Sequence, residues 1–136
     1  MTDLTSFKRA IVRVMNVERR FFGVGLLLKP DVAVTCAHVV ADALGVDRDV
    51  PDAPSGDVRL NLPFRNGSDE TTAAVMENGW FPRKSGGISD IVILRLHSPI
   101  KKAGYARLSS AIDLYSMPFE AWGGQEGHED SIVPFN

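Results

Sequence analysis

The stretch GVGLLLKPDVAVTCAHVV, residues 23–40, decides how this chain folds. Two apolar runs flank Lys-Pro-Asp at residues 29–31, and this tripeptide predicts a tight turn because proline fixes its φ and aspartate bonds its own backbone. Residues 21–28 and 32–35 are therefore expected to pair as a β-hairpin. One histidine, His38, comes three residues after the end of the second strand of that hairpin.

The rest of the chain repeats this pattern of short apolar and β-branched runs separated by Gly, Pro, Asp and Asn. No run keeps a helical period over about 11 residues, so the predicted class is all-β. The six expected strands are residues 9–17, 21–28, 32–35, 58–64, 71–77 and 90–96. Residues 47–57 and 77–90 are expected to be loops, and one more strand is expected at residues 119–122. Six strands of this length can close one small barrel.

Composition describes an ordinary globular protein. The chain has 136 residues, 44% hydrophobic and 24% charged, with a net charge of -2, which fits one domain and favours neither nucleic acid nor membrane as a partner. No apolar run approaches the roughly 18 residues of a membrane span, and the charged N-terminal region is unlike a signal peptide. The single cysteine, Cys36, excludes an internal disulfide. We therefore expect a cytoplasmic protein.

His38 is the first residue that could carry chemistry, because its ring titrates near neutral pH. Thr35 is expected to cap a short helical turn after the strand, its hydroxyl accepting from the amide of Ala37 or His38. That turn would hold the ring in a fixed orientation. A purely structural histidine is the alternative, because Val39 and Val40 continue an apolar wall.

Asp90 is the second candidate, because it is the charge at the head of the apolar run at residues 91–94. A carboxylate that enters a buried strand needs a partner to offset its desolvation, and a histidine Nδ1–H is one such partner. The alternative is an aspartate that caps a turn at the start of a strand. Taken alone, the residue leaves both interpretations open.

Together, VAVTCAHVV (residues 32–40) and SDIVILRL (residues 89–96) resemble two segments of the trypsin- and chymotrypsin-like serine peptidases. The first resembles the segment that carries the family's general-base histidine, and the second the segment that carries its aspartate. The order, His38 before Asp90, is that of the chymotrypsin type and the reverse of the subtilisin type. The resemblance extends over roughly residues 8–122.

This resemblance implies a six-stranded Greek-key barrel, the first half of a double barrel, with one short helical turn after the strand that leads to the histidine. Residues 1–118 would form that barrel, and residues 119–136 would begin the crossover to a second one. His38 and Asp90 would be the catalytic residues of this half. His38 would take the nucleophile's proton and return it to the leaving group, and Asp90 would orient the imidazole.

The sequence departs from the family at the nucleophile, because it has no Gly-Asp-Ser-Gly-Gly-like turn. The serines that follow Asp90 lack flanking glycines: Ser98, Ser109, Ser110, Ser116 and Ser131. Ser85, in KSGG, precedes the aspartate's own strand and is interpreted as part of a flexible loop. We therefore expect no nucleophile in this chain. Val39 stands where secreted animal members have a cysteine, so the resemblance is closer to intracellular or bacterial members.

Neither a metal nor a cofactor is expected. The candidate zinc ligands Cys36, His38, His97 and His128 show no paired metal-ligand spacing. Cys36 stands two residues before His38, a spacing that is not expected to bring both side chains to one point in a strand or tight turn. The cysteine is interpreted as a small core residue.

Three functions remain open. The first is the N-terminal half of a serine endopeptidase that cleaves protein or peptide substrates once a second barrel, in the same or another chain, supplies the serine. Alone, this chain is then expected to be inactive. The second is a catalytically inactive peptidase-like barrel that binds proteins within a larger assembly. The third is a plain β-barrel that matches the motifs by chance.

Overall fold

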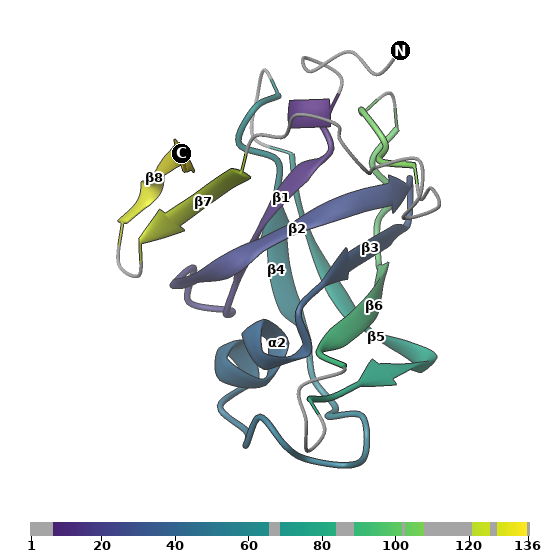
Figure 1. Cartoon of the computed structure of the whole chain (residues 1–136). Coiled ribbons are helices and arrows are strands. Elements are labelled where there is room, and N and C mark those ends of the chain that lie inside the picture. Colours follow the sequence, from purple (N-terminus) through teal and green to yellow (C-terminus); the bar gives the residue numbers. More distant parts are fainter. Residues whose placement is uncertain are drawn as a thin grey trace, which may run out of the picture.

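The computed structural model describes residues 7–65, 69–83, 89–101 and 103–107, and the backbone of residues 121–125 and 128–135. Six antiparallel strands close a barrel in the order β1-β2-β3-β6-β5-β4 (Figure 1). Their bounds are β1 (Ile11–Met15), β2 (Phe21–Lys29), β3 (Val32–Thr35), β4 (Val58–Asn61), β5 (Glu70–Phe81) and β6 (Ile91–Leu96). The predicted all-β class and the six-stranded barrel are confirmed.

The barrel has Greek-key connectivity. Strands β1, β2 and β3 follow one another as hairpins, whereas β4 returns to pair with β1 on its other side. Strand β3 then pairs with β6, which lies far along the chain. This is the spatial order 4-1-2-3 of a Greek key, extended by two strands that complete the closure.

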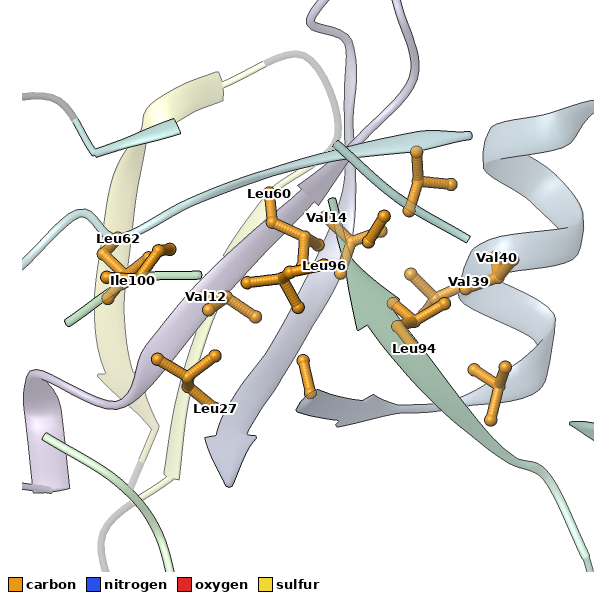
Figure 2. Close-up of a cluster of buried hydrophobic side chains, with 14 of the residues drawn as sticks. Val12, Val14, Leu27, Val39, Val40, Leu60, Leu62, Leu94, Leu96 and Ile100 are labelled. Carbon is orange, nitrogen blue, oxygen red and sulfur yellow. The ribbon is translucent and has the colours of Figure 1, made fainter. Parts of the chain in front are cut away.

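Alternation along the strands fills the barrel with aliphatic side chains (Figure 2). In β6, for example, Val92, Leu94 and Leu96 are buried and alternate with more exposed neighbours. Leu27 and Leu60 are fully buried. The core is thus built from side chains of strands that are distant in sequence, which makes the barrel one packing unit.

Strand β5 is longer than the sequence predicted. Residues 78–81, expected only as part of a loop, belong to this strand, because pairing with β6 resumes after a bulge. The pairs step from Val75 opposite Leu94 to Trp80 opposite Val92, so four residues of β5 lie in the bulge. Asn78 and Gly79 are residue types typical of turns, which is why this segment was expected to be a loop. In the structure they lie within the bulge of a continuous strand. The predicted 58–64 strand is shorter in the structure, ending at Asn61.

One helix, α2 (Ala37–Leu44), follows β3 and lies at one end of the barrel (Figure 1). It ends at Gly45, whose φ of 71° is the left-handed conformation typical of a helix C-terminus. Beyond the barrel, β7 (Ala121–Gln125) and β8 (His128–Phe135) form a two-stranded sheet, and β7 lies against β2. The tail therefore holds a hairpin where one strand at residues 119–122 was expected. No described helix is long and apolar enough to span a membrane.

Candidate functional site

The pairing of β3 with β6 determines where the candidate residues meet. The strands are antiparallel, with Thr35 opposite Val92, so the residues that follow β3 lie beside the residues that precede β6. His38 is the second residue of α2, and Asp90 stands immediately before β6. The barrel therefore brings together two side chains that are 52 positions apart in the sequence.

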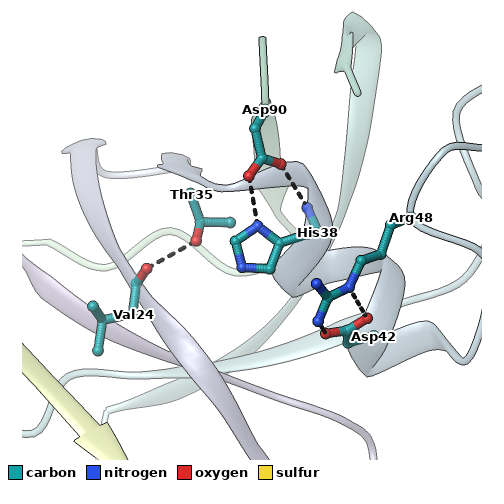
Figure 3. Close-up of polar contacts among 6 residues, drawn as sticks. All are labelled: Val24, Thr35, His38, Asp42, Arg48 and Asp90. Atoms are coloured by element: carbon teal, nitrogen blue, oxygen red, sulfur yellow. Dashed lines mark hydrogen bonds and ion pairs between the residues drawn. The ribbon is translucent and has the colours of Figure 1, made fainter. Parts of the chain in front are cut away.

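His38 and Asp90 form two hydrogen bonds (Figure 3). The ring Nδ1 of His38 lies 2.5 Å from Asp90 Oδ2, and the His38 backbone amide donates to Asp90 Oδ1 over 2.9 Å. Both carboxylate oxygens are thus used, which fixes the ring relative to the main chain. With Nδ1 held by the carboxylate, Nε2 is the ring atom left to exchange a proton with another group.

The expected role of Thr35 as a helix cap is wrong. Cys36 is the N-cap residue of α2 and provides no side-chain cap, while the Thr35 hydroxyl donates to the carbonyl oxygen of Val24 over 2.8 Å. Thr35 is the last residue of β3, and its side chain is buried against the neighbouring strand β2, where it finds this acceptor. In place of Thr35, Asp90 accepts a hydrogen bond from the amide of His38, the second residue of the helix, although Asp90 lies 52 residues further along the chain.

The surroundings keep Asp90 ionised. Partial burial acts to raise the pKa of this carboxyl, but the hydrogen bonds from the His38 side chain and backbone, together with the charges of His38 and Arg83, outweigh it and hold the pKa below its usual value. The φ of Asp90 is 155°, a backbone angle that residues with a side chain rarely adopt. Such a conformation is retained where surrounding contacts hold it, and here His38 supplies them.

Cys36 lies next to this pair, which corrects the expectation that its side chain and that of His38 diverge. The ligand atoms of Cys36, His38 and Asp90 all lie within 4.8 Å of one another. The backbone is extended at Cys36 and helical from Ala37, and this change of direction turns both side chains to one side. The cysteine is also exposed rather than part of the core. Partial burial and the negative charge of Asp90 raise the pKa of the Cys36 thiol.

The other candidates lie elsewhere. His97 pairs with Asp57, its Nε2 3.0 Å from Asp57 Oδ1, and both side chains are exposed. Ser98 follows the far end of β6, so the length of that strand separates it from Asp90. Ser85, Ser109, Ser110 and Ser116 fall outside the described residues. The side chains of Ser131 and His128 are likewise outside them, although both residues lie in β8.

Comparison with known proteins bears on the fold. No family model matches this chain, and no curated protein matches it. It is similar to the crystal structure of the scabies mite inactivated protease paralogue S-D1, with a TM-score of 0.59 and 15% sequence identity. The match covers 96% of this chain and 57% of that protein, so the chain spans little more than half of its neighbour's length. The fold is that of one barrel of a trypsin-like protein.

Sequence reasoning identified the two residues that meet, but it missed two features of their surroundings. The first is the hydrogen bond that the His38 amide donates to Asp90. Since Asp90 was expected to lie beside His38 at the start of a helical turn, it could have been predicted to accept from an amide of that turn as well. The second is the proximity of Cys36. Its only signal was its place between a strand and a helix, where the direction of the backbone changes.

Proposed function

We propose that this chain is the N-terminal half of a trypsin-like serine endopeptidase, with His38 as general base and Asp90 as the residue that orients it. The 2.5 Å contact between His38 Nδ1 and Asp90 Oδ2 carries this proposal. It leaves Nε2 to take the proton of a serine hydroxyl and later return it to the leaving amine. The ionised carboxylate stabilises the imidazolium that forms in between.

The nucleophile and the oxyanion hole belong, on this proposal, to a second barrel outside these 136 residues. The length of the structural neighbour, of which this chain covers 57%, supports the inference. The reading frame is expected to continue beyond Asn136 to a glycine-flanked serine. A stop codon at that point, with no neighbouring gene for a second barrel, would contradict the proposal.

The proposal can be tested with a fluorophosphonate probe, which reacts with activated serines. The probe is applied to the full-length natural protein. The probe is expected to label a serine outside residues 1–136, and His38→Ala is expected to abolish labelling because no base remains to activate the hydroxyl. His97→Ala is the matched control, since it removes a histidine from an exposed His–Asp pair elsewhere on the barrel. Absence of labelling in the folded protein, or labelling that survives His38→Ala, would refute the proposal.

A second candidate function is a peptidase-like barrel that binds proteins without cleaving them. It is supported by the structural neighbour, which is an inactivated protease paralogue. Two side chains that pair across β5 and β6 beside the site, Phe81 and Ile91, are about half exposed and offer an apolar contact for a protein partner. Failure of fluorophosphonate labelling in the folded protein would favour this function.

A further inference from the structure

Cys36, His38 and Asp90 bring three kinds of metal-ligating atom to one place, and no step of the proposed catalysis uses the cysteine. A thiol sulfur, an imidazole nitrogen and a carboxylate oxygen lie within 4.8 Å of one another. Among the described residues this is the group whose spacing suits a metal ion. We propose that these three side chains bind a divalent ion of the zinc type.

The donor set indicates the kind of metal. Thiolate and imidazole favour zinc and similar ions over magnesium or calcium, which prefer sites made of oxygen atoms alone. Zinc sites with three protein ligands keep a fourth position for water. The exposed position of Cys36, with His38 and Asp90 partly exposed beside it, leaves room for that water and a path for the ion.

The distances require only a small rearrangement. Ligand atoms at about 2.0 to 2.3 Å from a tetrahedral zinc ion lie about 3.3 to 3.7 Å apart. No separation in this group exceeds 4.8 Å, so no two ligand atoms need to approach each other by more than about 1 Å. The contact between His38 Nδ1 and Asp90 Oδ2 opens by a similar amount, because a metal that takes both atoms replaces the proton they share.

The charges also fit a divalent cation. A thiolate at Cys36 and the carboxylate of Asp90 together balance two positive charges, and binding releases the thiol proton. Arg83, whose charge acts on Asp90, opposes the ion, so the site is expected to bind more weakly than one without a neighbouring cation. Metal binding and service as a general base exclude each other, because a neutral imidazole that holds the metal at Nδ1 carries its proton at Nε2, the atom that would have to accept the serine proton. That consequence depends on the proposed function, whereas the binding itself does not.

Titration of the purified 136-residue chain with Co²⁺ alone, under a phosphine reductant, tests the site. One equivalent is expected to give the near-ultraviolet absorption of a cobalt–thiolate bond, and Zn²⁺ is expected to displace it. Cys36→Ala removes one ligand and should abolish the band and weaken zinc binding at least about tenfold, the lower bound known for lost outer-shell partners. This variant keeps the fold, because Cys36 is exposed and makes no side-chain cap.

His97→Gln is the matched control, because it alters a His–Asp pair that the described structure places away from the cysteine. It is expected to leave the cobalt band and the zinc affinity unchanged. A folded wild-type chain without the thiolate band, or zinc affinity unchanged by Cys36→Ala, would overturn the proposal. Failed fluorophosphonate labelling would instead refute the catalytic proposal and leave the cobalt result unaffected.

Discussion

At the scale of single residues, the site depends on one carboxylate that serves two purposes. Asp90 accepts from the His38 ring and from the His38 amide, so it orients a side chain and also satisfies a donor at the start of a helix. An aspartate in such a position is ionised in the folded state. Its charge therefore contributes to stability as well as to the proposed chemistry.

Asp90→Asn is expected to destabilise the barrel by about 1 to 3 kcal/mol at neutral pH, since it removes the charge from two hydrogen bonds. The folded-state pKa of Asp90 is lower than its ordinary value, so the stabilisation is complete above about pH 4 and declines as the pH falls through the folded-state pKa. The free energy of unfolding of the wild type and of Asp90→Asn can be measured by urea titration at about pH 7 and pH 3. The difference between the two proteins should be smaller at the lower pH.

The control for this experiment is Asp57→Asn, which removes the carboxylate of the exposed His97 pair. Exposed ion pairs contribute little, so its effect should stay within about 1 kcal/mol at either pH. A loss from Asp90→Asn that is the same at both pH values would show that the charge of Asp90 does not stabilise the fold.

At the scale of elements, the position of α2 depends on close packing against β2. A Cβ atom built at Gly23 would lie 2.7 Å from Val39 Cγ2, which is closer than side chains approach. The helix thus rests on a strand that has no side chain at this position. Since His38 precedes Val39, the same contact positions the ring.

Gly23→Ala is expected to cost about 1 to 3 kcal/mol of stability, because the added methyl group overpacks the contact with Val39. In a Val39→Ala background the methyl group finds space, so the two effects should be less than additive by about 0.5 kcal/mol or more. Urea unfolding of the two single variants and the double variant measures this coupling.

Gly45→Ala provides the matched control for this cycle. No atom lies within 4 Å of a Cβ at Gly45, so its cost comes from the left-handed backbone and not from packing. Val39→Ala should leave that cost unchanged. Equal rescue of Gly23→Ala and Gly45→Ala would contradict the packing explanation.

At the scale of the whole molecule, closure joins all six strands around one core. Strand β4 completes the barrel by pairing with β1 on one side and β5 on the other. Leu60 on this strand is fully buried within the shared cluster. A defect there is therefore a defect of the whole barrel.

Leu60→Ala is expected to lower the free energy of unfolding by about 2 to 5 kcal/mol, because it leaves a cavity in a packed core. Far-ultraviolet circular dichroism and tryptophan fluorescence should report the same shifted midpoint, as for a single cooperative unit. Val17→Ala, at an exposed apolar residue, should stay within about 0.5 kcal/mol of the wild type. Separate midpoints for the two probes would show that the barrel does not unfold as one unit.

The sequence by itself determined the approximate positions of the six barrel strands and the hairpin turn after Lys29, because period-two alternation and turn residues are local signals. It also identified His38 and Asp90 through a motif resemblance. The bulge in β5 escaped prediction, because Asn78 and Gly79 carry the same composition as a loop.

Only the tertiary structure decided which groups share the site. The register of β3 against β6 brings Asp90 to the start of α2, turns Thr35 toward Val24 and leaves Cys36 beside His38. These contacts join segments that are far apart in the chain, and a local pattern of apolar residues does not predict which distant segments come into contact. The sequence identified His38 and Asp90 as a pair, whereas closure of the barrel decided which other groups lie beside them.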